Sequence, residues 1–478
     1  MKQNNYTNIL ILLIVITYTV LFIFSIDFCY FWDNIQQTSS EAHFFYTTNF
    51  SIFPTNKFNL EFGLTGYHPP LIGLITATLW ELLGYNIWVS HAFIYLWALI
   101  LIYNTQQLIR HFVPENMVGW LVLILLFEPT VLTQFVIASP DFILLTAFVI
   151  SIRAIIEQKH FLLVFGAFFL FGINMRGVFA GIVLFVSNFI YLLYVSDFKL
   201  TSKTLIRNLL PYFPTFTFLA LYYILYFKIN GWFFTNSPYS EHYTLPSNMA
   251  RIITHFAEFG LRSIENGRFL IWGLGMYVFY LSISKFKKWS NEVKFIAFIF
   301  AGLFSIYFIF IFISQMPFSP RYFMPFYFLL SIIVIKKIIE NKKFKHVISF
   351  FLIILILEIS GNFWIYPEKI AKSWDTTLGH IPYYSLRKEC FNYIDSEKLD
   401  YNDISAGFCL YGNRKVIELK EPEKRIGNEV NRKYFIYSNI SNVEDEIAAD
   451  FKNKSKWREI KRFEKSNVYI SIFERITF

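Results

Sequence analysis

Long runs of apolar residues, separated by short polar segments, fill the chain up to residue 361. Each run is about 15–24 residues long, which is the length that an α-helix needs to cross the hydrocarbon core of a bilayer. The first run is longer than the apolar part of a signal peptide and lacks a small-residue cleavage site, so it reads as an uncleaved span. The pattern predicts an all-α polytopic membrane protein of about 11 spans, at residues 8–26, 87–109, 118–137, 142–156, 161–175, 178–195, 210–227, 269–283, 295–313, 322–335 and 347–360.

A shorter apolar run at residues 71–83 is interrupted by Gly73 and Glu81. If this run lies along the membrane interface, the basic loops near residues 110, 153–160, 199–207, 285–294 and 336–345 all fall on one side. The positive-inside rule assigns that side to the cytoplasm. We therefore expect an interfacial helix at 71–83, and outer loops at 27–70 and 230–268.

The segment 362–478 is rich in Lys, Glu, Asp and Asn and is long enough for a small domain. Alternating runs at 434–440 and 467–473 predict strands, and 443–451 predicts a helix. The sequence thus divides into a transmembrane domain, 1–361, and a soluble α/β domain, 362–478, on the outer side. Cys390 and Cys409 lie in this tail, where either a disulfide or two buried thiols fit the pattern.

Composition supports a membrane protein and argues against nucleic-acid binding. The chain is 55% hydrophobic and only 16% charged, against about 25% charged residues in soluble domains. Its net charge of +9 resides mainly in the short loops, where Lys and Arg orient spans and meet anionic lipids. No Walker A, GxGxxG, HExxH or GxSxG motif is present, which weakens ATP-driven transport and hydrolase functions.

Two aspartates are expected where apolar runs meet the outer surface. Asp33 follows the first span, and Asp141 opens the fourth. Acidic residues at a membrane boundary often mark a site, because they are costly there unless solvated or paired. Each also has a plainer interpretation: Asp33 as a solvated loop residue, and Asp141 as a carboxylate favoured by the positive end of its helix.

Further candidate side chains lie at the same predicted surface. His68 and Tyr67 belong to a Gly-Tyr-His-Pro-Pro-Leu turn, which its two prolines make rigid. Arg321, like Arg176, lies at a span end, where a guanidinium can bind a phosphate or a lipid headgroup. The remaining candidates for substrate or phosphate binding are Tyr322, His242 and Tyr243.

The ordered set of these features resembles the GT-C membrane glycosyltransferases. An acidic residue after the first span, the His68-Pro-Pro turn, Asp141 at the start of the fourth span and the Arg321-Tyr-x-x-Pro segment are most similar to glycosyltransferase family 39, the protein mannosyltransferase and aminoarabinose transferase superfamily. The chain departs from that pattern in having Asp33-Asn34 where many members have Asp-Glu. His68 also replaces a lysine, and a free histidine is mostly neutral at pH 7.

The resemblance implies a polyprenyl- or dolichyl-phosphate sugar donor, an inverting transfer and an inner (plasma) membrane location with the site outside. Lipid phosphate is a good leaving group, whereas the acceptor hydroxyl needs a base, for which we expect Asp33. Asp141 would orient the acceptor or hold a divalent cation. Arg321 and Arg176 would offset the phosphate charge. The partners implied are the donor lipid, membrane lipid, and an acceptor that is a glycolipid, glycan or protein.

Two alternative functions remain open at this stage. A transporter or flippase of a lipid-linked glycan would also need many spans, but transporters place charges near the bilayer midplane on broken helices. A polymerase or ligase of surface polysaccharide is the other alternative, and it would also be an enzyme. The sequence names neither the sugar nor the acceptor.

Overall fold

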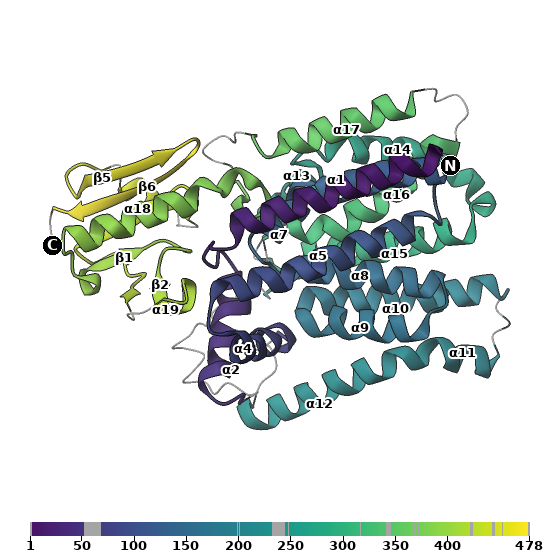
Figure 1. Cartoon of the computed structure of the whole chain (residues 1–478), viewed down its shortest axis with the longest axis horizontal. Helices are drawn as coiled ribbons and strands as arrows, with labels where there is room; N and C mark the ends of the chain where they lie inside the picture. The colour runs from purple at the N-terminus through teal and green to yellow at the C-terminus, as the bar shows by residue number, and fades with distance from the viewer. Residues whose placement is uncertain are drawn as a thin grey trace.

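The computed structural model is a body of long helices lying side by side, with a small sheet beyond one end (Figure 1). It describes residues 2–51, 68–197, 199, 201–231, 244–246, 248–315, 317–340, 346–364, 366, 370, 372–420, 424–441, 445–451 and 453–476. Tyr67, His242 and Tyr243 lie outside these residues.

Every predicted span forms helix, and several of the helices are long and apolar, as expected of a multi-pass membrane protein. In the described part of the chain, 6 helices are long and apolar enough to cross a membrane, or up to 7 if a bent pair counts as one span, so the predicted number of spans is not confirmed. The helices that correspond to the predicted spans are α1 (Lys2–Ser25), α5 (Ile87–Ile109), α6 (Glu115–Phe127), α7 (Pro129–Val136), α8 (Pro140–Ile156), α9 (His160–Ile173), α10 (Met175–Val195), α12 (Phe213–Asn230), α14 (Phe269–Ser282), α15 (Asn291–Ile313), α16 (Met324–Glu340) and α17 (Val347–Gly361).

The run at 118–137 forms two helices, α6 and α7, which bend by 62° at the break between them. Pro129 cannot donate the backbone hydrogen bond that would continue α6. The Glu128 carboxylate accepts a hydrogen bond from Val131 N at 3.0 Å and caps α7. A proline and an acidic cap thus start a new helix, α7, inside an apolar run.

The polar connections contain shorter helices. Residues 71–83 form α4 (Leu71–Leu83), with the predicted bounds. In Figure 1, α4 and α2 (Glu41–Thr47) do not run parallel to the long helices and lie at the end nearer the sheet; the interfacial position of α4 stays a prediction. The other helices of the connections are α11 (Ser202–Leu209) and α13 (Met249–Ile264).

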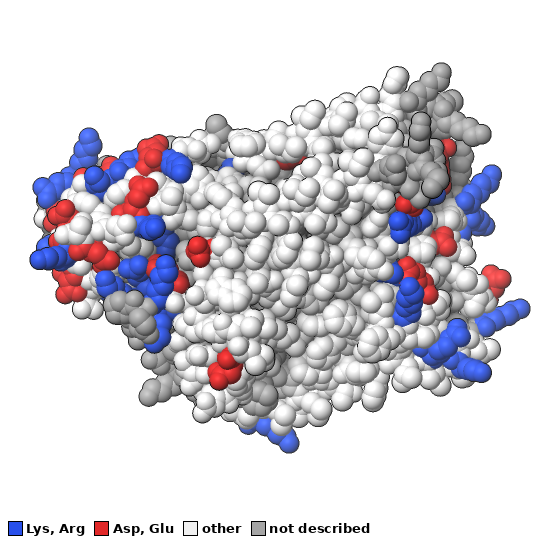
Figure 2. Space-filling view, viewed as in Figure 1, with Lys and Arg blue, Asp and Glu red and all other residues white. Residues whose placement is uncertain are grey.

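Charged residues gather at the two ends of the molecule. Figure 2 shows Lys, Arg, Asp and Glu over the sheet at one end and over the helix ends at the other, with a broad surface nearly free of charge between them. Arg110, Arg153 and Lys337 all belong to the end away from the sheet, since they lie at or near the ends of α5, α8 and α16. A charge-poor band between two charged ends is the surface expected of a protein in a bilayer.

The tail folds into a small α/β unit, as predicted. Its main sheet has the strand order β1-β4-β6-β5, with β1 parallel to β4 and the other pairs antiparallel. Helix α18 (Pro382–Ser396) packs against β5 and β6. The remaining elements are α19 (Arg414–Ile417), α20 (Asp445–Asp450), β1 (Ile404–Ala406), β2 (Gly412–Asn413), β3 (Arg425–Ile426), β4 (Tyr434–Ser438), β5 (Trp457–Lys465) and β6 (Val468–Arg475). Cys390 and Cys409 are buried free thiols.

The segment after α1 packs directly against this tail unit. Phe28 stacks on Tyr384 with ring centroids 3.8 Å apart. Phe31 is fully buried and stacks on His380 at 4.8 Å. Tyr30 N donates a hydrogen bond to Ile417 O at 3.1 Å. The residues that lead to Asp33 are therefore held by the tail.

We predict that Ser51→Cys and Ser396→Cys are both labelled by a membrane-impermeant thiol reagent on intact cells. Both positions are exposed, and the packing of the first loop on the tail requires one side for both. Ser202→Cys, on α11 near the basic ends, should react only after permeabilisation, because the positive-inside rule places it in the cytoplasm. Labelling of Ser51→Cys without Ser396→Cys, or of Ser202→Cys in intact cells, would contradict this topology.

Candidate functional site

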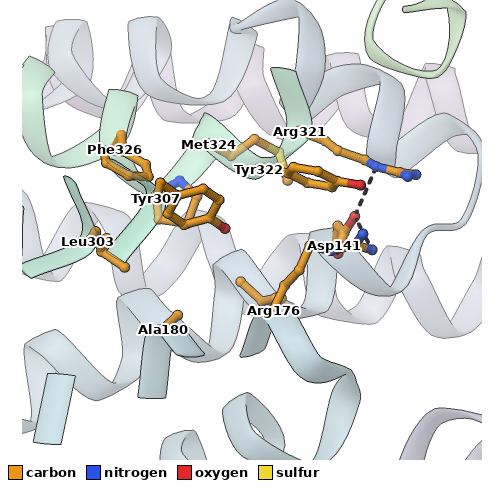
Figure 3. Close-up of a pocket in the computed structure, with 11 residues that line it drawn as sticks. Asp141, Arg176, Ala180, Leu303, Tyr307, Arg321, Tyr322, Met324 and Phe326 are labelled. Atoms are coloured by element: carbon orange, nitrogen blue, oxygen red, sulfur yellow. Dashed lines mark hydrogen bonds and ion pairs between the residues drawn. The ribbon is translucent and has the colours of Figure 1, made fainter. Parts of the chain in front are cut away.

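Charged side chains from distant parts of the chain meet at the end of the helices nearer the sheet. They come from the loop after α1, from the first turns of α8 and α10, from η5 (Pro320–Phe323) and from η6 (Trp374–Thr376). Figure 3 shows Asp141, Arg176, Arg321 and Tyr322 directed toward one another. With Asp33 from the loop after α1, five of the residues singled out in the sequence are thus brought together at one place.

Arg321 lies at the centre of this cluster, with its side chain 4% exposed. Its guanidinium forms an ion pair with Asp33. Its Nη1 lies 2.9 Å from Asp375 Oδ2, and its Nε lies 3.6 Å from Asp141 Oδ2. One positive charge is therefore shared by three carboxylates that come from three separate segments.

Asp141 binds Arg176 rather than its own helix end. Arg176 donates from Nε to Asp141 Oδ1 at 3.1 Å, and its Nη2 lies 2.9 Å from Oδ2. Ser139 caps α8, because its hydroxyl accepts from Asp141 N at 3.1 Å. The carboxylate of Asp141 is thus not needed as a cap, and its contacts belong to the charged cluster.

The turn between α9 and α10 sets the position of Arg176. Asn174 caps α10 by accepting from Gly177 N at 2.9 Å, and its Nδ2 donates to Asp141 Oδ1 at 3.0 Å. A Cβ on Gly177 would lie 2.0 Å from Leu170 O, so glycine permits the close approach of α10 to α9. One asparagine therefore both starts the helix and orients the aspartate.

Two residues near the aspartates have left-handed backbone conformations. Trp32, directly before Asp33, has φ 56°, and Ala138, near the start of α8, has φ 52°. Residues other than glycine rarely adopt this backbone conformation, and those that do concentrate at functional sites. Asn34 Nδ2 donates to Ile137 O at 2.7 Å, which joins the two turns.

A small pocket lies beside the charged cluster, between η5, α8, α10, α15 and α16. Its polar end is formed by Asp141, Arg176, Arg321 and Tyr322, and its walls are mostly apolar (Figure 3). The ring of Tyr322 lies 4.8 Å from the guanidinium carbon of Arg176 and 5.5 Å from that of Arg321. The residues that line the rest of the pocket are Leu144, Ala180, Leu303, Tyr307, Met324, Pro325 and Phe326.

His68 is buried beside the cluster and carries no charge. Its Nδ1 accepts a hydrogen bond from Met175 N at 3.3 Å, which requires a neutral nitrogen. Burial and the nearby Arg176 lower the pKa of His68 to about 3. The rigid turn therefore places a neutral ring next to Arg176, rather than the permanent positive charge of a lysine.

Asp33 is ionised and remains partly accessible, with 28% of its side chain exposed. Burial favours the neutral acid, but Arg321 and Arg176 outweigh it and lower the pKa of Asp33 below its usual value. An ionised carboxylate that reaches solvent can accept a proton, provided that its guanidinium partner does not hold it permanently.

A divalent cation at Asp141 finds no clear set of ligands. Both oxygens of Asp141 already contact Arg176, and one also accepts from Asn174. Among the residues that the structure describes, no group of three or more His, Cys, Asp or Glu side chains is placed to hold a metal ion. The arrangement of Asp141 suits an ion pair with arginine better than metal coordination.

The sequence pattern identified neither Asp375 nor Arg268 and Glu128, which hold the segment that carries Arg321. Asp375 lies in the polar tail, where aspartates are common, and its buried environment is visible in the structure alone. Arg268 and Glu128 carried a stronger signal, because Arg268 directly precedes an apolar run and Glu128 lies inside one. Unpaired charges at such places are costly, so a pair should have been sought.

Arg268 and Glu128 form a fully buried ion pair beneath Arg321. Arg268 Nε donates to Glu128 Oε1 at 2.9 Å, and the two side chains are 0% and 1% exposed. Arg268 also donates to Pro320 O at 2.9 Å, directly before Arg321, and to Thr130 Oγ1 on α7 at 2.9 Å. The pair thus joins the α6–α7 bend to the segment that carries Arg321.

The fold and the site define a multi-pass helical membrane protein with a buried ionic cluster at one end. Two solved structures share this fold: ArnT from Cupriavidus metallidurans bound to undecaprenyl phosphate, with a TM-score of 0.54, and the same protein in the apo state, with 0.52. Each is 11% identical in sequence, with 96% of this chain and 97% of that chain covered. The predicted GT-C fold is confirmed. No family model and no curated protein matches the sequence.

We predict that Arg268→Gln lowers the free energy of unfolding by about 3–5 kcal/mol, because it leaves Glu128 buried without its counter-charge. Arg110→Gln is the matched control, since the Arg110–Glu115 pair is 39% exposed on both sides, and such pairs contribute about 0–1 kcal/mol. Thermal and denaturant unfolding in detergent measure both variants. Equal losses in the two variants would contradict the role given to the buried pair.

Proposed function

We propose that this protein is a glycosyltransferase that moves a sugar from a polyprenyl-phosphate-linked donor to an acceptor hydroxyl on the outer face of the membrane. The observation that carries the proposal is the convergence of Asp33, Asp141, Arg176 and Arg321, the last three of which line the polar end of a mostly apolar pocket. The likeness in fold to ArnT, solved with undecaprenyl phosphate, supports a lipid phosphate as the ligand.

The two ends of the pocket suit the two parts of such a donor. Arg176 and Arg321 at the polar end can pair with a phosphate, since guanidinium groups bind phosphate oxygens through paired hydrogen bonds. The mostly apolar walls beyond them suit prenyl groups, which gain by leaving water. The sugar would then lie on the open side of the arginines, near Asp33.

Asp33 acts as the general base in this proposal. The phosphate of the donor replaces Asp33 on the guanidinium of Arg321, and the freed carboxylate accepts the proton of the acceptor hydroxyl. The acceptor oxygen attacks C1 of the sugar as the bond from C1 to the phosphate oxygen breaks. The electron pair of that bond leaves with the lipid phosphate, and attack from the opposite face inverts C1.

Asp141 serves the donor site indirectly. Its two oxygens hold the Arg176 guanidinium, and Asn174 fixes the carboxylate from the other side. This arrangement keeps Arg176 directed toward the pocket before a donor arrives. A divalent cation held between Asp141 and the phosphate stays a prediction.

We predict that Asp33→Asn abolishes transfer while undecaprenyl phosphate still binds, because Arg321 loses a competing carboxylate but keeps its charge. Mass spectrometry of glycolipids and glycoproteins should find one sugar-bearing product in cells with the wild-type gene and none in cells that carry only Asp33→Asn. Binding to the purified protein is measured by thermal shift, with undecaprenol as the control that lacks phosphate.

Near-normal product in Asp33→Asn cells would remove Asp33 as the base. Absence of any product that depends on the wild-type gene would contradict transferase function altogether. A flippase would instead move a lipid-linked glycan across vesicle membranes without changing its mass, so the same mass measurement separates the two functions.

We predict that Asp141→Asn cuts transfer by orders of magnitude, because Arg176 loses the carboxylate that orients it. The matched variant Ser139→Ala removes the cap of the same helix, which should lower stability by about 1 kcal/mol with little change in rate. Assays with and without a chelator accompany both variants. Normal turnover in Asp141→Asn would show that Arg176 does not depend on this carboxylate, and loss of wild-type activity with chelator would support a bridging cation.

A further inference from the structure

Asp375 is the carboxylate of the cluster that the proposed reaction leaves unused. Its side chain is 3% exposed and lies 2.9 Å from Arg321 Nη1. Its position is fixed on two sides: its backbone carbonyl accepts from Gln134 Nε2 on α7 at 2.6 Å, and the neighbouring Trp374 donates from Nε1 to Asn439 O in the tail at 3.0 Å. The tail thus delivers a buried negative charge to the centre of the site.

Two carboxylates compete for one guanidinium at this place. Asp33 pairs with Nη2 of Arg321 and Asp375 with Nη1, while Asp141 approaches Nε. Burial raises the pKa of Asp375, and Asp33 adds to the rise, although Arg321 opposes it. The pKa of Asp33 is instead lowered by the same arginine. The more strongly Asp375 interacts with the guanidinium of Arg321, the less strongly Arg321 stabilises the ionised form of Asp33.

We infer that Asp375 is a positioning residue that holds Arg321 from the tail side and, by competing for its charge, keeps Asp33 basic and releasable. This inference rests on the proposed function. Without Asp375, Arg321 would bind Asp33 and an incoming phosphate more strongly. A tighter hold on Asp33 would lower its basicity, and a base with a lower pKa takes a proton less readily.

The charges that face Asp375 come from every element of the cluster. Arg321 is on η5, Asp33 on the loop after α1, and Asp141 on α8. Arg176 on α10 pairs with Asp141, and His68 is neutral. With three carboxylates and two arginines, these described residues sum to a formal charge of −1. An entering phosphate therefore meets excess negative charge, to which Asp375 contributes.

The test compares Asp375→Asn with wild type in two measurements of opposite expected sign. Undecaprenyl phosphate should bind the purified full-length variant about tenfold more tightly, because one buried negative charge near the phosphate is gone. Transfer in native membranes, which supply donor and acceptor, should be about tenfold slower at neutral pH, because Asp33 is less basic. The acid limb of the rate profile should move to lower pH.

Three further variants separate charge from structure. Asp375→Glu keeps the charge and should keep the affinity and pH profile near those of wild type. Gln134→Ala removes the hydrogen bond to the backbone carbonyl of Asp375 without changing any charge, so this variant should not bind phosphate more tightly. Asp395→Asn removes a carboxylate from α18 that is 43% exposed and should leave both measurements unchanged.

Unchanged or weaker phosphate binding in Asp375→Asn, or tighter binding in Asp375→Glu as well, would overturn the inference. Failure of Asp375→Asn and Asp375→Ala to fold, seen by thermal unfolding, would also overturn it by showing a structural role. If wild type itself neither binds undecaprenyl phosphate nor forms product, the proposed function fails instead, so the two failures are distinguishable.

Discussion

Arg321 is the point on which the arrangement of this protein depends. It brings one positive charge to a place where three buried or partly buried carboxylates approach it. Buried charges are tolerated when they are paired, and removing one partner leaves the other uncompensated. Each segment that supplies a charge must therefore be held in register with the others. The loop after α1, α8, η5 and the tail are fixed relative to one another by this requirement.

The supports of Arg321 explain why a bend interrupts an apolar run. Pro129 and Glu128 end α6 and start α7, and α7 then meets two segments of the site. Its Thr130 accepts from Arg268, which also holds the carbonyl before Arg321, and its Gln134 holds the carbonyl of Asp375. Thr130 and Gln134 lie one turn apart on the same face of α7, which allows both contacts. The bend is thus part of the site, because the buried pair of Arg268 and Glu128 joins it to the segment that carries Arg321.

The sequence predicted well whatever depends on local pattern. Apolar runs identified the helices, α4 has the expected bounds, and Asp33, Asp141 and Arg321 were conspicuous as charges at membrane boundaries. The sequence could not predict which charged side chains form ion pairs with one another, because ion pairing depends on tertiary packing. The roles expected for Asp141, which were to orient the acceptor, to hold a cation or to stabilise its helix end, did not include its contact with Arg176, and the cap of that helix is Ser139. Asp375 looked like any aspartate of a polar tail, since its burial follows from the docking of that tail.

The docking of the tail explains why it is attached to the helical body. A soluble lobe that only bound an acceptor could be joined by a loose linker, but this lobe buries Phe31 two residues before Asp33 and positions Asp375 next to Arg321. Asp33 and Asp375 thus reach the same guanidinium from two segments that both contact the lobe. Any shift of the lobe, for example on binding an acceptor, would change the balance between them. The basicity of Asp33 and the affinity for phosphate would then change in opposite directions, because both depend on the single charge of Arg321.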